Sequence, residues 1–262
     1  MQTRFEELAQ SLARAWSSCG TIPLPAAERA PRTRAEAFAV QDRMAEVLAE
    51  PCAGWKVGAA VRAVQIFEGH DGPITGRVPA SRLQHSPGRF PAAFAGYKIE
   101  CEFAFRFGRD VPARKGGYTR AELESDLVLH PALEVAGSRY AAAAGDRKQT
   151  THDAIADNGG GGAIVLGAAV PDWRRYDLAK LSIDARIDGG SPIRVYDGEY
   201  RRDPVDILVE TVNGLSERGI GLAAGDILST GSLTLPTPLM AGQSYVARFA
   251  ELPPLSVRVE AR

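Results

Sequence analysis

The sequence has few cysteines, no long apolar run and no block of basic residues. Its 262 residues include three cysteines, Cys19, Cys52 and Cys101, which lie far apart. This spacing matches neither a zinc finger nor a disulfide framework, and it favours a reducing compartment. No apolar run approaches the roughly 18 residues of a membrane-spanning helix, and the first residues lack the apolar segment of a signal peptide. We therefore expect a cytoplasmic protein with no membrane partner.

The charges are balanced and dispersed. The chain has 31 basic and 32 acidic side chains, which gives a formal net charge of -1. Without a basic patch, nucleic acid and anionic membranes are poor candidates as partners. The length suits one large domain, or one domain with a small helical appendage, and it is sufficient for a substantial core.

The first part of the chain has the pattern of helices. Apolar residues recur at helical spacing in residues 5–15 and again at positions 37, 40, 44 and 47. Thr33 and Glu36 form the pattern of a capping box at the start of the second helix. We therefore predict a helical N-terminal part over residues 1–53.

The remainder, residues 54–262, is predicted to be a β-rich catalytic body that forms one integrated domain with the first part. Residues 54–98 are rich in glycine and proline and indicate strands joined by long loops. Segments 99–108, 130–135 and 161–167 are predicted strands, and segments 181–190 and 191–198 suggest a hairpin. Asp203 and Pro204 are typical of a helix start. The predicted fold class is α+β.

One predicted strand, IECEFAFRFG at residues 99–108, contains two acids in its first half. Side chains alternate between the two faces of a strand. Cys101, Phe103 and Phe105 therefore share one face, which we expect to be buried. Glu100 and Glu102 share the other face, so a firmly anchored strand would hold two like charges side by side.

A third acid, Glu134, lies in the apolar segment HPALEV. Buried carboxylates are costly unless they are matched by a cation. Each acid could pair with a base such as Arg106 or Arg139, or the three could converge on a hard divalent cation such as Mg2+ or Mn2+. The plainer alternative is a solvated sheet face with exposed acids.

Lys56 follows Trp55 in an equally apolar segment. It is either a lysine whose stem lies along a strand edge or a buried functional lysine. Two histidines, His70 and His152, titrate near neutrality when unperturbed, but loop histidines are more often solvated, and we leave both off the list of catalytic candidates.

The ordered motifs GWKVG, YKIECEFAFRFGRD, HPALEVAGSR, IADN and AAGDILSTGS resemble those of the 2-oxopent-4-enoate (2-hydroxypentadienoate) hydratases. The sister enzymes are 4-oxalocrotonate decarboxylases, and both belong to the fumarylacetoacetate hydrolase superfamily. The resemblance covers most of the chain. It implies a mixed, rolled β-structure with a smaller helical N-terminal part.

The same resemblance assigns roles to particular residues. It implies that Glu100, Glu102 and Glu134 bind Mg2+ or Mn2+. It places Lys56 and Asp157 in the catalytic site, and it implies that the loop Thr230, Gly231 and Ser232 holds the substrate carboxylate. On spacing alone, Asp157 with Asn158 is an Asx turn and the loop is only a tight connection.

The activity implied by the resemblance is metal-dependent addition of water to a 2-hydroxy-2,4-dienoate, giving a 4-hydroxy-2-oxo acid, in the catabolism of aromatic compounds. The substrate would be a small 2-oxo or 2-hydroxydienoic acid, and a homo-oligomer is expected. The first alternative is decarboxylation of a 4-oxalocrotonate-like acid, or hydrolysis of a C–C bond in an acylpyruvate. The second is a non-catalytic relative that binds a small acid.

Two departures from the family pattern lie where the substrate tail or the added water would be handled. Ile74 stands where many hydratases have an acid, and Asp71 is nearby but offset. Glycines at 159–162 replace small hydroxyl residues. Arg201 and Arg202 could meet a second carboxylate of a larger substrate, although a solvated basic turn is the simpler interpretation.

Overall fold

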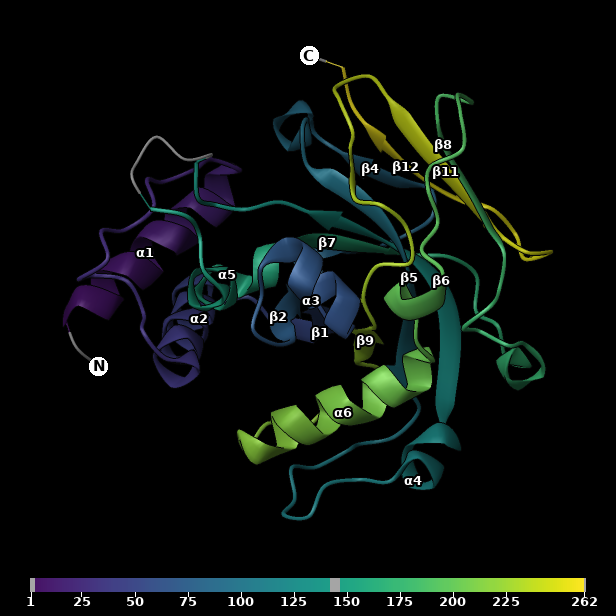
Figure 1. Cartoon of the computed structure of the whole chain (residues 1–262), viewed down its shortest axis with the longest axis horizontal. Coiled ribbons are helices and arrows are strands. Elements are labelled where there is room, and N and C mark those ends of the chain that lie inside the picture. Colours follow the sequence, from purple (N-terminus) through teal and green to yellow (C-terminus); the bar gives the residue numbers. More distant parts are fainter. Residues whose placement is uncertain (1–2, 142–146, 262) are drawn as a thin grey trace.

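The computed structural model describes residues 3–141 and 147–261. Within these ranges it contains the α-helices α1 (Thr3–Ser18), α2 (Arg34–Leu48), α3 (Arg62–Glu68), α4 (Arg120–Glu124), α5 (Thr151–Ala156) and α6 (Pro204–Glu217). In Figure 1, α1 and α2 lie at one side of the molecule and α6 lies below the strands. No helix in the described ranges is both long and apolar enough to cross a membrane.

The strands of the described residues form two sheets. The larger sheet has the order β2-β1-β9-β5-β6-β7-β3 with β10 beside β5, and the smaller has the order β4-β12-β11-β8. Parallel pairs (β1 with β9, β3 with β7, β4 with β12) occur among antiparallel ones. The bounds are β1 (Cys52–Gly58), β2 (Ile74–Pro79), β3 (Leu83–His85), β4 (Gly88–Phe90), β5 (Lys98–Phe107), β6 (Leu127–Ala136), β7 (Gly161–Leu166), β8 (Ile183–Ile187), β9 (Ile227–Ser229), β10 (Thr237–Pro238), β11 (Ser244–Phe249) and β12 (Leu255–Val259).

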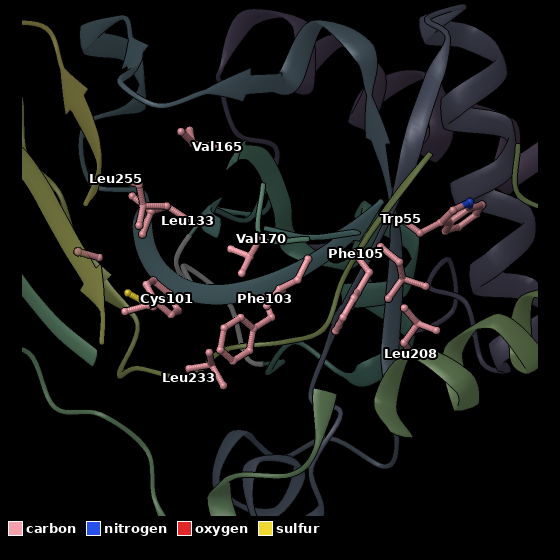
Figure 2. Packing of buried hydrophobic residues seen from close by; sticks show 14 of the residues in the cluster. Trp55, Cys101, Phe103, Phe105, Leu133, Val165, Val170, Leu208, Leu233 and Leu255 are labelled. Carbon is pink, nitrogen blue, oxygen red and sulfur yellow. The ribbon is translucent and has the colours of Figure 1, made fainter. Parts of the chain in front are cut away.

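The central strand β5 is anchored by its aromatic face. Cys101, Phe103 and Phe105 are completely buried, as the alternation predicted, and Figure 2 shows them within the main apolar cluster. Phe103 packs against Phe249 of the smaller sheet, with ring centroids 5.4 Å apart. Burial of each such side chain stabilises the fold by about 1.5–3 kcal/mol. The predicted α+β class with a mixed β-body is therefore confirmed.

The N-terminal helices share apolar contacts with residues of the β-rich part. Leu12 of α1 and Met44 of α2 belong to a second apolar cluster that also contains Ile74 of β2 and Ile155 of α5. The boundary predicted after residue 53 stays a prediction. The capping box predicted at Thr33 is only half formed, because the Glu36 carboxylate accepts from the backbone N–H of Arg32 instead.

One local prediction was wrong, because residues 54–98 contain helix α3 in addition to strands and loops. The predicted hairpin over 181–198 is formed only in part. Its first arm is β8, which pairs with β11, and Ile193 N–H of the second arm donates to the carbonyl of Ala185 at 2.8 Å. Beyond that contact the second arm pairs with a distant segment, where Leu235 N–H donates to the carbonyl of Arg194 and Tyr196 N–H to that of Leu233.

Gly76 of β2 is a point of close backbone approach. A Cβ atom there would lie 2.2 Å from the carbonyl oxygen of Asn158. Asn158 is held against the same strand, since its Oδ1 accepts from Arg77 N–H at 2.7 Å and its Nδ2 donates to the Arg77 carbonyl at 2.9 Å. Only glycine fits at this position.

We expect Gly76→Ala to lower the free energy of unfolding by about 1–3 kcal/mol, because the added methyl group must push two backbone segments apart. Gly214→Ala in α6 is the matched control, since its Cβ would meet nothing within 4 Å, and it should be neutral or stabilise by up to about 1 kcal/mol. Urea denaturation measures both. Equal effects of the two variants would contradict the close approach.

Candidate active site

Three carboxylates converge on one face of the large sheet. Strands β5 and β6 pair antiparallel with Glu100 directly opposite Glu134 and Glu102 opposite Ala132. Directly opposed residues present their side chains to the same face. One carboxylate oxygen from each of the three acids lies within 4.8 Å of the others. The small side chain of Ala132 leaves room for them.

Two of the three acids are buried. Glu102 is 1% exposed and Glu134 is 2% exposed, whereas Glu100 is partly buried and lines a cavity. The alternative of a solvated sheet face with exposed acids was therefore wrong. The expected basic partners are engaged elsewhere: Arg106 donates to the carbonyl of Gly225, and Arg139 pairs with Asp157.

The partner of the cluster is Lys56 on β1. Its Nζ lies 3.2 Å from Glu134 Oε1 and donates to the carbonyl of Gly159 at 2.5 Å. The side chain is 6% exposed, so the alternative of a lysine along a strand edge was wrong. Burial acts to lower its pKa, but the charges of Glu134, Glu100 and Glu102 outweigh burial and raise the pKa of Lys56.

One ammonium does not balance three carboxylates. Burial, and then the charge of Glu134, raises the pKa of Glu100 to about 8, and burial raises that of Glu102 well above its ordinary value. Glu102 Oε1 is buried and accepts no hydrogen bond, and Glu134 Oε1 has Lys56 Nζ near it at 3.2 Å. When all are ionised, the group has a surplus of two negative charges. Its donors are hard oxygens, so this site fits a divalent cation.

The loop after β9 supports this cluster. Ser229 Oγ donates to Glu102 Oε2, and Gly231 N–H donates to the same oxygen at 3.1 Å. Thr230 Oγ1 donates to the carbonyl of Phe103 at 3.0 Å, and Ser232 Oγ donates to that of Thr234 at 2.5 Å. Several donors of the predicted substrate loop are therefore engaged by the protein. Ser229 was missed by the sequence analysis, although it lies in the quoted STGS motif.

Asp157 is not brought to the carboxylates. Its Oδ1 pairs with Arg139 Nε at 2.5 Å, and its Oδ2 accepts from Ser138 Oγ and Arg139 N–H, each at 2.9 Å. Burial raises the pKa of Asp157, although Arg139 opposes this. Arg139 also donates to the carbonyl of Gly161 at 2.5 Å. The pair therefore shapes the glycine segment that meets Lys56.

A cavity of about 430 Å³ opens onto the site. Its walls include Lys56, Glu100, Glu134 and the loop 230–232, together with Ile74, Glu68 and His70. Arg201 and Arg202 also line it, and both are half-buried. Both are engaged by the protein: Arg201 donates to the carbonyls of Leu178 and Leu181, and Arg202 pairs with Glu210.

The comparison with known proteins agrees with the motifs. The chain is 29% identical to a 2-keto-4-pentenoate hydratase of Paraburkholderia phymatum over 95% of both chains. It is 26% identical to a 2-hydroxyhexa-2,4-dienoate hydratase of Comamonas testosteroni, over 78% of this chain and 76% of the relative. This chain is a homologue of these hydratases. The predicted resemblance is confirmed, although no family model matches the chain.

The fold is shared with solved structures. A 4-oxalocrotonate decarboxylase of Pseudomonas putida, complexed with magnesium and adipate, has a TM-score of 0.85 at 21% identity over 99% of this chain and 98% of that chain. A fumarylpyruvate hydrolase of Pseudomonas aeruginosa, with Mn2+ and pyruvate, has a TM-score of 0.57 at 18% identity over 81% and 91%. The predicted rolled β-structure with a helical N-terminal part is thereby confirmed.

The buried charges predict how cation binding depends on pH. The folded protein holds Glu100 with a pKa of about 8, above its ordinary value of 4.5. Between these values the folded state binds more protons than the unfolded state, so the metal-free protein loses stability as pH rises. A cation replaces those protons. We expect Mg2+ or Mn2+ to raise Tm by several degrees, and by more at about pH 8 than at about pH 6.

Thermal unfolding with EDTA or with added cation, at both pH values, measures this difference. Glu102→Gln should abolish the cation-induced shift in Tm. The exposed acid Glu7 on α1 gives the control variant Glu7→Gln, which should retain it. A wild-type shift in Glu102→Gln would show that the cation binds elsewhere.

Proposed function

We propose that this chain is a divalent-cation-dependent hydro-lyase that adds water to a 2-hydroxy-2,4-dienoate of the 2-oxopent-4-enoate type and forms a 4-hydroxy-2-oxo acid. The observation that carries the proposal is the cluster of Glu100, Glu102 and Glu134, with Lys56 beside it and with Glu100 and Glu134 lining a cavity. The names of the relatives support the reaction, and the similarity covers 95% of this chain for one relative and 78% for the other.

The carboxylates would hold Mg2+ or Mn2+. A bound divalent cation would supply electrophilic stabilisation of the negative charge that develops on the C2 oxygen of the substrate. The chain's own contribution is to fix the three acids before substrate arrives. Ser229 and Gly231 hold Glu102, and the strand pairing holds Glu100 opposite Glu134. Such preorganisation limits rearrangement during the reaction.

Lys56 is the proposed proton-transfer residue near C2 and C3. Its ammonium lies beside the carboxylates and faces the cavity. The carbonyl of Gly159 and the carboxylate of Glu134 fix its position. A positioned acid of this kind donates to developing enolate charge and returns a proton to carbon.

The cavity loop and Asp157 have supporting roles in this proposal. The loop 230–232 lines the cavity. We propose that it contacts the substrate carboxylate through Thr230, Gly231 and Ser232. Asp157 acts as a positioning residue instead, because it holds Arg139 and, through it, the glycine segment.

Decarboxylation of an oxalocrotonate-like acid is the second candidate, because the decarboxylase fold matches over almost the whole chain. We also expect the reaction to take place in the cytoplasm, where the free cysteines of the described residues would stay reduced. The homo-oligomer stays a prediction.

Freshly generated 2-hydroxypenta-2,4-dienoate should lose its ultraviolet absorbance with the enzyme and Mg2+ or Mn2+, and EDTA should stop the loss. Mass spectrometry should identify 4-hydroxy-2-oxopentanoate as the product. Turnover of 4-oxalocrotonate with release of CO2, without hydration of the dienoate, would favour the second candidate.

Lys56→Met should lower kcat by about 100-fold or more while the cation-induced Tm shift persists.

Asp157→Asn should lower both stability and kcat, because it leaves Arg139 buried without its counter-ion and frees the glycine segment beside Lys56. The expected loss of stability is about 3–5 kcal/mol. Asp153→Asn is the matched control, since Asp153 is equally buried and pairs with Arg147 away from the cavity lining. It should lose stability but keep kcat. Equal kcat values in the two folded variants would contradict the positioning role.

A further inference from the structure

The cavity contains a second acidic group that the metal cluster does not use. Among the described residues that line it, Glu68 is the one carboxyl besides Glu100 and Glu134. Glu68 ends helix α3, and His70 follows two residues later and lines the same cavity. Glu68 was not among the predicted site residues, because α3 was not predicted.

The two side chains face each other at a distance suited to a shared water. Glu68 Oε2 lies 3.8 Å from His70 Nε2, and the side chains are 33% and 19% exposed respectively. This is too long for a direct hydrogen bond. One water molecule can contact both atoms at once.

Thr151 orients the imidazole. Its Oγ1 accepts from the backbone N–H of Asp71 at 3.1 Å and lies 3.3 Å from His70 Nδ1. The Thr151 hydroxyl can donate to Nδ1 while its oxygen accepts from Asp71. In that tautomer the imidazole proton lies on Nε2, the ring nitrogen nearer Glu68.

The other groups that line the cavity are less suited to take a proton from water. Ile74 has no titratable group. Lys56 is committed to Glu134 and Gly159. Tyr200 stacks on Tyr196, with ring centroids 5.7 Å apart, and arginines do not deprotonate in proteins.

The electrostatic surroundings agree with this role. Burial raises the pKa of Glu68, with Lys56 and Lys98 opposing. Burial also lowers the pKa of His70, so the imidazole is neutral at pH 7. A carboxylate with a raised pKa is a more effective base near neutrality than an ordinary one.

We propose that Glu68 and His70 together bind and activate the water that adds to the substrate, Glu68 as the proton acceptor and His70 as the group that holds the water oxygen. The inference rests on the proposed hydratase function. The water oxygen bonds to C4 of the 2-oxo-3-enoate tautomer while one water proton passes to Glu68. The C3=C4 π electrons move into the C2–C3 enolate, and C3 then takes one proton, so that one H2O is added in total.

Two assays separate water addition from proton transfer at C3. Hydration of 2-hydroxypenta-2,4-dienoate is followed by absorbance. Exchange of the C3 hydrogens of 2-oxopentanoate, which cannot add water, is followed by NMR in D2O with Mg2+. Glu68→Gln should lower hydration by about 100-fold or more, and His70→Ala by about 10-fold or more. Both should retain C3 exchange and the cation-induced Tm shift.

Glu7→Gln is the control. Glu7 is an exposed acid on α1 and does not line the cavity, so both assays should stay at wild-type rates. Hydration by Glu68→Gln within about three-fold of wild type would overturn this inference alone. Equal loss of hydration and of C3 exchange in Glu68→Gln would also overturn it, because Glu68 would then affect proton transfer at C3 as much as water addition. A wild-type enzyme that exchanges C3 hydrogens without hydrating the dienoate would overturn the proposed function, and this inference with it.

Discussion

The surplus of negative charge at the β5–β6 pair is the constraint on which the site depends. Three carboxylates and one ammonium are held in a region from which water is largely excluded, where like charges repel strongly. Without a cation, the group reduces its charge by holding protons, as the raised pKa of Glu100 shows. The cluster therefore lowers the stability of the empty protein and favours any divalent ion that replaces those protons. Natural proteins accept such local losses at functional sites and recover the stability elsewhere.

The apolar face of β5, opposite its carboxylates, contributes stability that offsets this loss. Cys101, Phe103 and Phe105 are completely buried, between residues of both sheets and α6. Because side chains alternate, each acid of β5 is followed by an apolar residue that anchors it from behind. A strand with a less buried reverse face could move so that its acids separate. The carboxylates of β5 therefore keep their positions only because the aromatic side chains on the opposite face are buried.

The sequence predicted which acids would share a site. The alternation of side chains along a strand placed Glu100 and Glu102 on one face, and the apolar neighbours of Glu134 indicated a buried acid. The sequence did not predict the hydrogen-bond and ion-pair partners of the site residues, because these depend on strand register and on contacts between distant segments. Nothing near Asp157 in the sequence indicates that Arg139 will occupy both of its oxygens, or that Ser229 will reach Glu102. Helix α3 was missed for a different reason: with seven residues and no capping side chain, it carries little periodic signal. Its contribution to the cavity wall, Glu68, was missed with it.

The same contacts connect the N-terminal helix α1 to the segment that holds Lys56. Arg139 stacks over the ring of Trp16 on α1, at 4.8 Å from its centroid, and binds Asp157 on its other side. Asp157 begins the turn that leads to Gly159, whose carbonyl receives the ammonium of Lys56. A buried guanidinium needs both its counter-ion and a packed environment. If α1 moved away, Arg139 would lose its aromatic contact, and the segment that fixes Lys56 would lose its support. The helical part therefore stabilises the position of the lysine without contributing a residue to the cluster of carboxylates.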